Sequence, residues 1–458
     1  MKKALITLLV VAILASALAF SASAANFEHL ADELNALGLF RGTDAGYDLD
    51  RAPNRGEGLV MLIRLLGLEE QALACDSETP FSDVPAWLKP YVAYAYENDL
   101  TNGTSDTTYS PGSPCSAQMY VTFVLRALGY SDGDGGDFTY AGALDFGKKA
   151  GIIDDSLLSG DFLRDQMVAV SYLALIAAPK GGDYDFLINK LIDDGAISRE
   201  TALKVLAKWP LLSELAALGS GLDGSENMEM KIKIDADLGS LGALLAGMGM
   251  GANFSIDMDM SMVMEDDDIL AAISMVMDIM GDAREMQMYM ADGYAYVDTG
   301  DQKIKTDAGL SNISGILAMT DVSQLTSYPL YITEISNDIE GEYTVYSFNF
   351  AEGYVNSAMG MASGLIGSLG LDSMGAGDMD ITISGIKFYA DSDGALSKIA
   401  MQFDVSATIN MGIPMRMNIK MNMEAEIVAT GDSVKVELPG NLDEYEEVDR
   451  EAALAAAA

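Results

Sequence analysis

The chain has 458 residues, and its 69 Asp and Glu against 27 Lys and Arg give a formal net charge of -42 at pH 7. This length leaves room for roughly two or three domains, and the acidic excess argues against nucleic acid and anionic membrane surfaces as partners, because both would be repelled. The single histidine, His29, leaves a Ser-His-Asp or Cys-His centre without a base and argues against a histidine zinc site. We therefore expect neither an enzyme nor a cofactor.

Residues 1–24 have the pattern of a secretory signal peptide. Two lysines precede an apolar run from Ala4 to Phe20, and small residues from Ala22 to Ala24 follow it. No cysteine lies near this region to carry a lipid, and no later apolar run is long enough to cross a bilayer as a helix. The sequence therefore predicts an exported protein without a transmembrane segment.

The pattern of residues 80–130 predicts a helix-loop-helix unit. Apolar residues from Trp87 to Leu100 recur at three- and four-residue intervals, which indicates a first helix with Asp83 as its cap. A polar loop follows, and Ser116 stands where an N-cap would begin a second helix that ends at Gly129. We expect Trp87 to be buried in the core rather than to form a platform for a sugar.

Similar units lie on either side, so the chain contains an internal repeat. Residues 53–67 align with 115–129, residues 39–43 align with 100–104, and a weaker copy covers 137–180. We therefore predict repeats at residues 26–74, 80–130 and 137–180, a helical extension at 181–218 and a linker at 219–226.

The motifs of these units resemble the S-layer homology (SLH) module. They are F-x-D-V from Phe81, W-x-x-P-Y-V from Trp87, a G-T loop from Gly103 that ends in proline, and second-helix starts similar to T-R-A-E. The resemblance covers about residues 26–180, and three copies are the usual complement of that module. It implies an all-α bundle with pseudo-threefold symmetry. It also implies non-covalent attachment at the surface of a Gram-positive cell to an acidic, pyruvylated secondary cell-wall polysaccharide linked to peptidoglycan.

In that module an arginine at the start of the second helix lies in a groove between repeats and holds the polysaccharide. The three segments that match are Asn54-Arg55-Gly56-Glu57, Ser116-Ala117-Gln118-Met119, which lacks the arginine, and Leu163-Arg164-Asp165-Gln166. A guanidinium beside free helix N-terminal amides suits a carboxylate, and a glycine would allow the loop turn after each first helix. The resemblance therefore implies a polymer site made of Arg55, Arg164, Asn54, Glu57, Gly42, Gly103 and Ser116, with the groove of the second unit weakened. The alternative for Arg55 is a structural ion pair with Glu57 or Asp50.

Beyond residue 226 the apolar period changes from about 3.6 to about 2. Alternation predicts strands at residues 228–235, 254–265, 285–299, 341–350, 380–411, 415–429 and 432–439. Two segments rich in Gly, Ala and Met, 238–254 and 355–377, are expected to form short helices over one face. We predict an α + β protein whose C-terminal domain, residues 227–440, is a large antiparallel sheet, followed by a frayed acidic tail at 441–458.

Most of the 29 methionines fall in this C-terminal domain. A methionine-lined face suits a groove for an acyl chain or an apolar peptide, and it also suits a loosely specified core. The domain resembles, more weakly, Gram-positive surface proteins with a lipoprotein-carrier-like half-barrel, which implies the holding of an apolar ligand. The alternative is a structural S-layer or adhesion component with no small ligand.

Two features of the repeat region leave alternatives open. Cys75 and Cys115 would form a disulfide between the first two repeats, or would remain separate buried thiols. Asp132 and Asp134 are spaced like the start of a calcium loop, but Ala143 stands where an EF-hand has Glu. That rejects an EF-hand and leaves a loose calcium site or a solvated loop, so no metal ligands are predicted.

Overall fold

The computed structural model describes residues 27–448, apart from 44–45, 134, 159, 221–226, 240–252 (except 242 and 247), 266–267, 280, 308–328, 353–375 and 411–413. The predicted signal peptide, most of the predicted linker and nearly all of the two predicted covering helices lie outside these residues. Within the described part, no helix is both long enough and apolar enough to cross a membrane. The chain divides into two compact units between Trp209 and Pro210.

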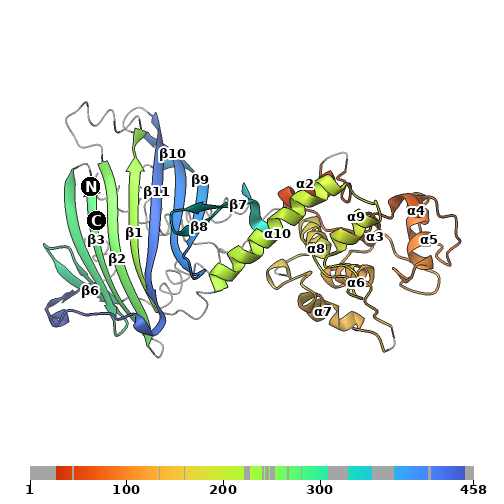
Figure 1. Ribbon diagram of the computed structural model, residues 1–458, viewed down its shortest axis with the longest axis horizontal. Helices are drawn as coiled ribbons and strands as arrows, with labels where there is room; N and C mark the ends of the chain where they lie inside the picture. The colour runs from red at the N-terminus through yellow and green to blue at the C-terminus, as the bar shows by residue number, and fades with distance from the viewer. Residues whose placement is uncertain are drawn as a thin grey trace. The chain divides into compact units, whose positions relative to one another are not determined.

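The first unit is helical. Its helices are α2 (Glu28–Ala36), α3 (Arg55–Leu65), α4 (Glu69–Leu73), α5 (Lys89–Glu97), α6 (Ala117–Ala127), α7 (Ala143–Lys149), α8 (Arg164–Leu175), α9 (Leu187–Asp193) and α10 (Arg199–Ser220), which continues past Trp209. The second helices of the three predicted repeats, α3, α6 and α8, contact one another (Figure 1). Their fully buried apolar side chains, such as Leu62, Val124 and Val168, lie in the core of the unit.

Two of these helices begin against the loop of another repeat, in the same register. The loop before α6 lies along the start of α3, and the loop before α3 lies along the start of α8. The backbone donors and their carbonyl acceptors are Arg55 to Ser113 (2.8 Å), Gly56 to Pro111 (2.9 Å), Arg164 to Arg51 (2.9 Å) and Asp165 to Leu49 (3.1 Å). Because these donors and acceptors occupy aligned positions, the first two repeats use their loops in the same way.

The described part of the second unit holds one sheet of 12 strands. In sheet order they are β12 (Glu446–Glu447), β6 (Lys303–Asp307), β5 (Tyr294–Asp298), β4 (Asp282–Ala291), β3 (Asp268–Ile279), β2 (Asn253–Glu265), β1 (Met228–Asp237), β11 (Pro414–Thr430), β10 (Leu396–Asn410), β9 (Ala376–Ala390), β8 (Tyr343–Phe350) and β7 (Ile332–Glu340). Neighbouring strands are antiparallel, except that β12 is parallel to β6. The predicted α + β class with a large antiparallel sheet is confirmed (Figure 1).

Alternation explains why these segments form half-buried strands. In β1, Met230, Ile232 and Ile234 are buried, whereas Lys231 and Lys233 between them are exposed. Each of these lysines lies opposite a carboxylate on both neighbouring strands: Lys231 faces Asp259 and Glu426, and Lys233 faces Asp257 and Glu424. A slip of one residue would turn both lysines into the apolar face, so the charge pairs and the buried row fix the same register.

Four parts of the sheet differ from the prediction. Strands β3, β6 and β7 are absent from the prediction because none of them shows clear apolar alternation. β3 is a nearly continuous apolar run, β6 is short, and β7 is largely acidic and polar. The strand predicted at residues 432–439 is not formed, and a 3-10 turn (Gly431–Ser433) begins there instead. Since β11 is already paired with β1 and with β10, no free edge is left for a continuing hairpin.

The described part of the predicted tail, residues 441–448, is not frayed. It ends as β12 beside β6, and two ion pairs join the segments: Lys303 to Glu444 at 3.1 Å and Lys305 to Glu447 at 3.0 Å. The acidic run therefore has partners, because β6 presents lysines at the edge of the sheet. Residues 449–458 lie outside the described part of the chain.

Three side chains of the repeat region also need correction. Cys75 and Cys115 are both free, so the disulfide is not formed. Their surroundings differ: the Cys75 sulfur lies half-buried, 3.7 Å from Glu97, whereas Cys115 is buried, so only the second of the two predicted buried thiols is found. Trp87 is 59% exposed rather than buried, because it precedes the first turn of α5 and lies outside the buried face of that helix.

Candidate functional site

Arg55 is the first residue of α3, and its neighbours cap that helix. The Asn54 side chain accepts the Glu57 backbone N–H at 2.9 Å, and the Glu57 carboxylate accepts the Asn54 backbone N–H at 2.8 Å. This reciprocal capping box satisfies two amides at the helix start. Asn54 and Glu57, both predicted polymer ligands, therefore hold the backbone that carries Arg55.

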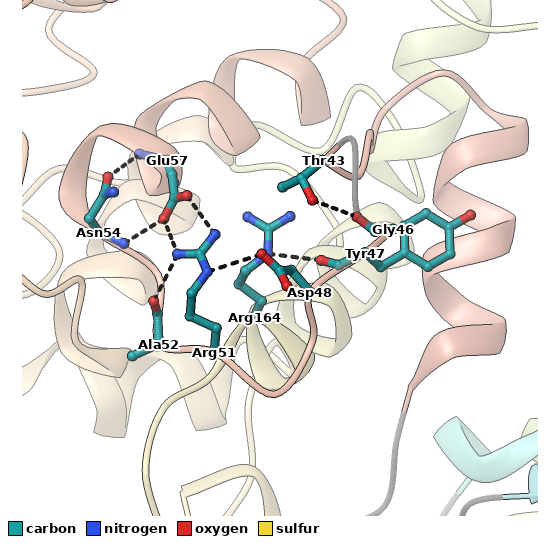
Figure 2. Close-up of polar contacts among 9 residues, drawn as sticks. All are labelled: Thr43, Gly46, Tyr47, Asp48, Arg51, Ala52, Asn54, Glu57 and Arg164. Atoms are coloured by element: carbon teal, nitrogen blue, oxygen red, sulfur yellow. Dashed lines mark hydrogen bonds and ion pairs between the residues drawn. The ribbon is translucent and has the colours of Figure 1, made fainter.

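The Glu57 carboxylate pairs with Arg51. Arg51 donates to both carboxylate oxygens, at 3.0 and 2.8 Å (Figure 2). Burial alone would raise the pKa of Glu57, but the hydrogen bonds from Arg51 and from the Asn54 backbone outweigh it and leave that pKa below its ordinary value. Within the described residues, the alternative ion pair of Arg55 with Glu57 or Asp50 is not formed.

The Arg55 side chain is only 7% exposed and lies among groups that do not neutralise it. The guanidinium donates to the Asn102 carbonyl at 2.5 Å and to the Met119 sulfur at 3.2 Å, and its carbon lies 4.6 Å from the Tyr109 ring centre and 5.4 Å from that of Phe123. Its Nε is buried and has no hydrogen-bond partner in the described structure. A buried cation without a carboxylate partner is costly, so this position favours an anion bound beside the guanidinium.

A pocket of about 250 Å³ opens beside this guanidinium. Its lining comes from all three predicted repeats and consists of Arg55, Asn102, Gly103, Thr104, Met119, Thr122, Phe123, Arg126 and Tyr140. Arg126 is already bound by both oxygens of Asp132, at 2.8 and 2.7 Å, whereas Arg55 has no carboxylate partner among the described residues. The pocket therefore combines one uncompensated cation with aromatic and hydroxyl groups, and none of these lining residues is acidic.

The two predicted loop glycines are needed for steric room. A Cβ on Gly103 would lie 2.3 Å from the Phe81 ring, and a Cβ on Gly42 would lie 2.4 Å from the Gly46 carbonyl oxygen. Both distances are far shorter than a carbon-carbon or carbon-oxygen contact allows, so a larger residue would force the loop apart. The absence of a side chain at Gly103 therefore lets this part of the pocket lining pack directly against Phe81.

The same loops carry backbone strain at aligned positions. Asp48 in the first repeat and Ser110 in the second both have positive φ, 59° and 60°. The Asp83 carboxylate, predicted to cap α5, instead accepts the backbone N–H groups of Tyr109 and Ser110 at 2.8 and 2.7 Å. It therefore pins the strained turn that presents the Tyr109 ring to the Arg55 guanidinium.

Arg164 repeats the arrangement at the start of α8. It is 6% exposed, donates to the Tyr47 carbonyl at 3.0 Å and lies 5.4 Å from the Phe40 ring centre. Burial lowers the pKa of this guanidinium. Figure 2 shows Arg164 between Tyr47 and Arg51. It does not line the Arg55 pocket, so the two predicted arginines lie against different loops.

The second repeat has no cation at the equivalent place. Ser116 caps α6 by accepting the Met119 backbone N–H at 3.3 Å, and Ala117 stands where the other repeats have arginine. Gln118 donates to the Tyr140 carbonyl at 2.5 Å. Ser116 therefore orients α6, the helix that supplies part of the Arg55 pocket.

Several groups around Arg55 have no place in the sequence-based prediction. Met119 and Phe123 are four residues apart on α6, and this spacing would have shown that they share the face of the helix that borders the pocket. Tyr109 comes from a loop and Tyr140 begins a short 3-10 helix (Tyr140–Gly142), and no local pattern indicates where their rings lie.

Among the described residues, no group of three or more His, Cys, Asp or Glu side chains is arranged to hold a metal ion. Of the two aspartates considered for calcium, Asp132 is paired with Arg126, and Asp134 lies outside the described residues.

Residues 80–116 match the family model of the S-layer homology domain. This stretch is an S-layer homology domain. It begins just before Phe81 and ends at Ser116, so it includes the Gly103 loop and the Asp83 contacts that hold it. The loop that covers Arg55 therefore belongs to the SLH domain.

Known cell-surface proteins are similar to part of the chain. The middle cell wall protein of Brevibacillus brevis is 30% identical over 109 residues, which are 23% of this chain and 10% of that protein. A cell surface protein of Thermoanaerobacter kivui is 27% identical over 187 residues, which are 40% of this chain and 22% of that protein. An endoglucanase of a Bacillus species is 27% identical over 121 residues, which are 24% of this chain and 12% of that enzyme. The chain thus spans about a tenth to a fifth of the length of these relatives. The SLH domain together with the surface-protein relatives identifies a cell-surface protein.

One solved structure, LprF from Mycobacterium bovis, matches 50% of this chain and 96% of its own chain, with 10% identity and a TM-score of 0.28. A TM-score this low does not establish a shared fold. The carrier-like half-barrel therefore stays a prediction.

Proposed function

We propose that residues 25–209 attach the protein non-covalently to the cell wall by binding an acidic, pyruvylated secondary cell-wall polysaccharide. The three SLH repeats, at residues 26–74, 80–130 and 137–180, would form a pseudo-threefold bundle with α3, α6 and α8 at its centre. The matched SLH domain and the surface-protein relatives support a role at the wall. The mutual contacts of the three second helices support the bundle.

The observation that carries this proposal is the buried, unneutralised guanidinium of Arg55 beside a pocket. A carboxylate of the polysaccharide bound in the pocket would neutralise the guanidinium of Arg55, and Tyr140, which is 49% exposed, offers a ring face to the adjoining sugar. Hydrogen bonds to charged groups contribute about 1.5–3 kcal/mol, which corresponds to roughly 10- to 150-fold in affinity. Electrostatic attraction of the whole protein does not supply this affinity, since the net charge is -42. Binding must therefore come from local cations such as Arg55.

Retention on purified cell-wall sacculi tests the proposal. Arg55→Met removes the donors while keeping a long apolar side chain, and it should weaken retention at least about tenfold. Arg199→Met is the matched control, because that arginine carries the same charge but is 68% exposed and far along the chain from the pocket. Sacculi stripped of the secondary polysaccharide should retain neither the wild type nor either variant.

Arg164 allows a second step in the same assay. If its groove also binds the polymer, Arg55→Met combined with Arg164→Met should lose more than Arg55→Met alone. Circular dichroism checks that both variants keep their helices. Equal retention of the wild type and of a folded Arg55→Met/Arg164→Met variant would remove both arginines from the binding site.

We further propose that the sheet unit is the part displayed outside the wall. Its apolar rows, represented by Ile234, Met401 and Met423, are buried, which supports a packed core and a structural role more than an open groove for an apolar ligand. Titration of the full chain with a fluorescent fatty acid separates the two roles. Saturable binding would support a carrier, and its absence would favour the structural component.

We propose no catalytic activity. One relative is an endoglucanase, but the match covers only 12% of that protein. Hydrolysis of a glycosidic bond ordinarily needs a pair of carboxyl groups, and the described lining of the Arg55 pocket contains none.

A further inference from the structure

The C-terminal strap, residues 434–448, runs from β11 to the far edge of the sheet. In sheet order β11 and β6 are separated by β1 to β5, and the strap passes these strands before it ends as β12 (Figure 1). On the way Leu438, Leu442 and Tyr445 pack against Tyr296 and its neighbours, and Tyr445 meets the Tyr296 ring edge-on at 5.5 Å between centres. The strap therefore covers an edge that would otherwise be open.

The strap holds this edge by few backbone contacts. β12 pairs only Glu446 with Ile304 and Glu447 with Lys305, and the Val448 N–H donates to the Lys305 carbonyl at 3.0 Å. The carboxylate partners of the two ion pairs are 59% and 64% exposed, so these pairs contribute little and are weakened by salt. Such a short strand can be displaced by a longer one.

At the opposite edge of the sheet, no strand among the described residues pairs with the outer side of β7. Residues 336–340 are all exposed, and Ile339 is 68% exposed. This strand carries Glu334, Asp338 and Glu340 and has no Lys or Arg. Glu340 binds Lys387 of β9 at 2.6 Å, whereas Asp338 has no ion-pair partner among the described residues. An exposed edge strand with free backbone groups is a template for another strand.

We propose that the β6 edge of one copy binds the β7 edge of a second copy, and that the strap is an intramolecular substitute for that strand. The argument is charge complementarity. β6 presents Lys303 and Lys305, and the segment that it binds in this structure is acidic with apolar residues among the acids, Glu444-Tyr445-Glu446-Glu447-Val448. β7 offers the same kind of strand, Asp338-Ile339-Glu340, with more backbone exposed.

The two edges are different surfaces, so this contact is head to tail. Each copy that binds through β6 still offers β7, and the assembly grows until it closes or continues as an open chain. The strap competes with the β7 strand of a second copy for the β6 edge. As a tethered segment, it does so at an effective concentration on the order of millimolar. The contact between copies therefore forms where the protein is concentrated or the strap is released.

Analytical ultracentrifugation of the full chain and of a chain ending at Gly440 tests the proposal. The full chain should sediment as a monomer at micromolar concentration, and the shortened chain should form larger species as its concentration rises. Ile339→Lys in the shortened chain should restore the monomer. The matched control is Val276→Lys, because Val276 is 39% exposed but lies on β3 in the interior of the sheet, away from both edges.

Two further variants keep the test decisive if the shortened chain does not fold. Glu444→Lys with Glu447→Lys repels the strap from β6 in the full-length chain and should give the same larger species. In the charge swap, one copy carries Lys303→Glu and Lys305→Glu and the other carries Asp338→Lys and Glu340→Lys. The first copy keeps its wild-type strap, because its new glutamates already repel Glu444 and Glu447, and the second copy also carries Glu444→Lys and Glu447→Lys. Each should stay monomeric alone, and the mixture should associate.

The proposal is overturned if folded strap-released chains remain monomeric up to about millimolar concentration, the range of the tethered strap. It is also overturned if they associate but Ile339→Lys has no more effect than Val276→Lys. Association of each charge-swapped chain with itself would likewise contradict it, because edge pairing requires opposite charges on β6 and β7.

Discussion

Replacement of Asp165 by Asn should change how the stability of the helical unit depends on pH. Asp165 is the second residue of α8 and is 5% exposed, and its carboxylate accepts the Phe27 backbone N–H at 2.6 Å. Burial raises the pKa of Asp165 to about 7, with a smaller opposing effect of the Phe27 hydrogen bond and a contribution from nearby Asp50 in the same direction as burial. Asn keeps a carbonyl oxygen for the Phe27 N–H and removes the charge.

The sign follows from proton binding. An unfolded aspartate has a pKa of about 3.9, so between roughly pH 4 and pH 7 the folded chain holds a proton that the unfolded chain has lost. The free energy of unfolding therefore falls as pH rises through this window. With a pKa of about 7 in the folded state, the gap is about three units at ~1.4 kcal/mol each, which sets an upper bound of about 4 kcal/mol. Above about pH 7 the penalty is complete and constant.

Urea unfolding of wild type and Asp165→Asn, followed by circular dichroism between pH 4.5 and pH 8, measures this difference. The two proteins should be close in stability at the acidic end. The variant should be more stable at pH 8, by up to about 4 kcal/mol. Carboxyls with lowered pKa, such as Glu57 and Glu69, contribute the opposite trend to both proteins and cancel in the comparison. A stability difference that does not change with pH, or a variant that is less stable at pH 8, would refute the reasoning.

Two further predictions concern the Arg55 pocket and the equivalent position at the start of α6. Gly103→Ala should lower the melting temperature and weaken sacculus retention, because its methyl group would meet the Phe81 ring at 2.3 Å. Overpacking of this kind costs about 1–3 kcal/mol, and Gly112→Ala is the control, since no atom lies within 4 Å of its added carbon. Ala117→Arg should raise sacculus retention by supplying the cation that the second repeat lacks at the start of α6. Unchanged retention would show that this groove lacks more than an arginine.

The helix starts of the candidate site were predictable because their signals are local. Asn54 and Ser116 cap α3 and α6 as their residue types indicate, and each accepts a backbone N–H three residues further on. The partner of Arg55 was not predictable, because the Asn102 carbonyl lies 47 residues away along the chain. Capping is decided within one turn of helix, whereas the environment of a buried side chain depends on which repeat packs against which.

The sheet shows the same division. Period-2 alternation revealed β1 and β2, whose two faces differ sharply in polarity. It missed β7, because an edge strand exposed over most of its length has no buried face to mark it. The sequence predicts no partner for the acidic tail for a related reason. An acidic run shows only its own charge, whereas the three-dimensional order of the strands places Lys303 and Lys305 beside it at the edge of the sheet.

Because Cys75 and Cys115 are free thiols, the stability of the repeat region should not depend on the redox state of the medium. Since no covalent bond joins the repeats through these residues, a reducing agent has no bridge there to cleave, and attachment to the wall should survive in oxygen-free, sulfide-rich media as well as in air. Refolding after denaturation likewise needs no oxidant and no shuffling of sulfur pairs. The repeats are then held together by packing, hydrogen bonds and ion pairs, with no covalent link through Cys75 and Cys115.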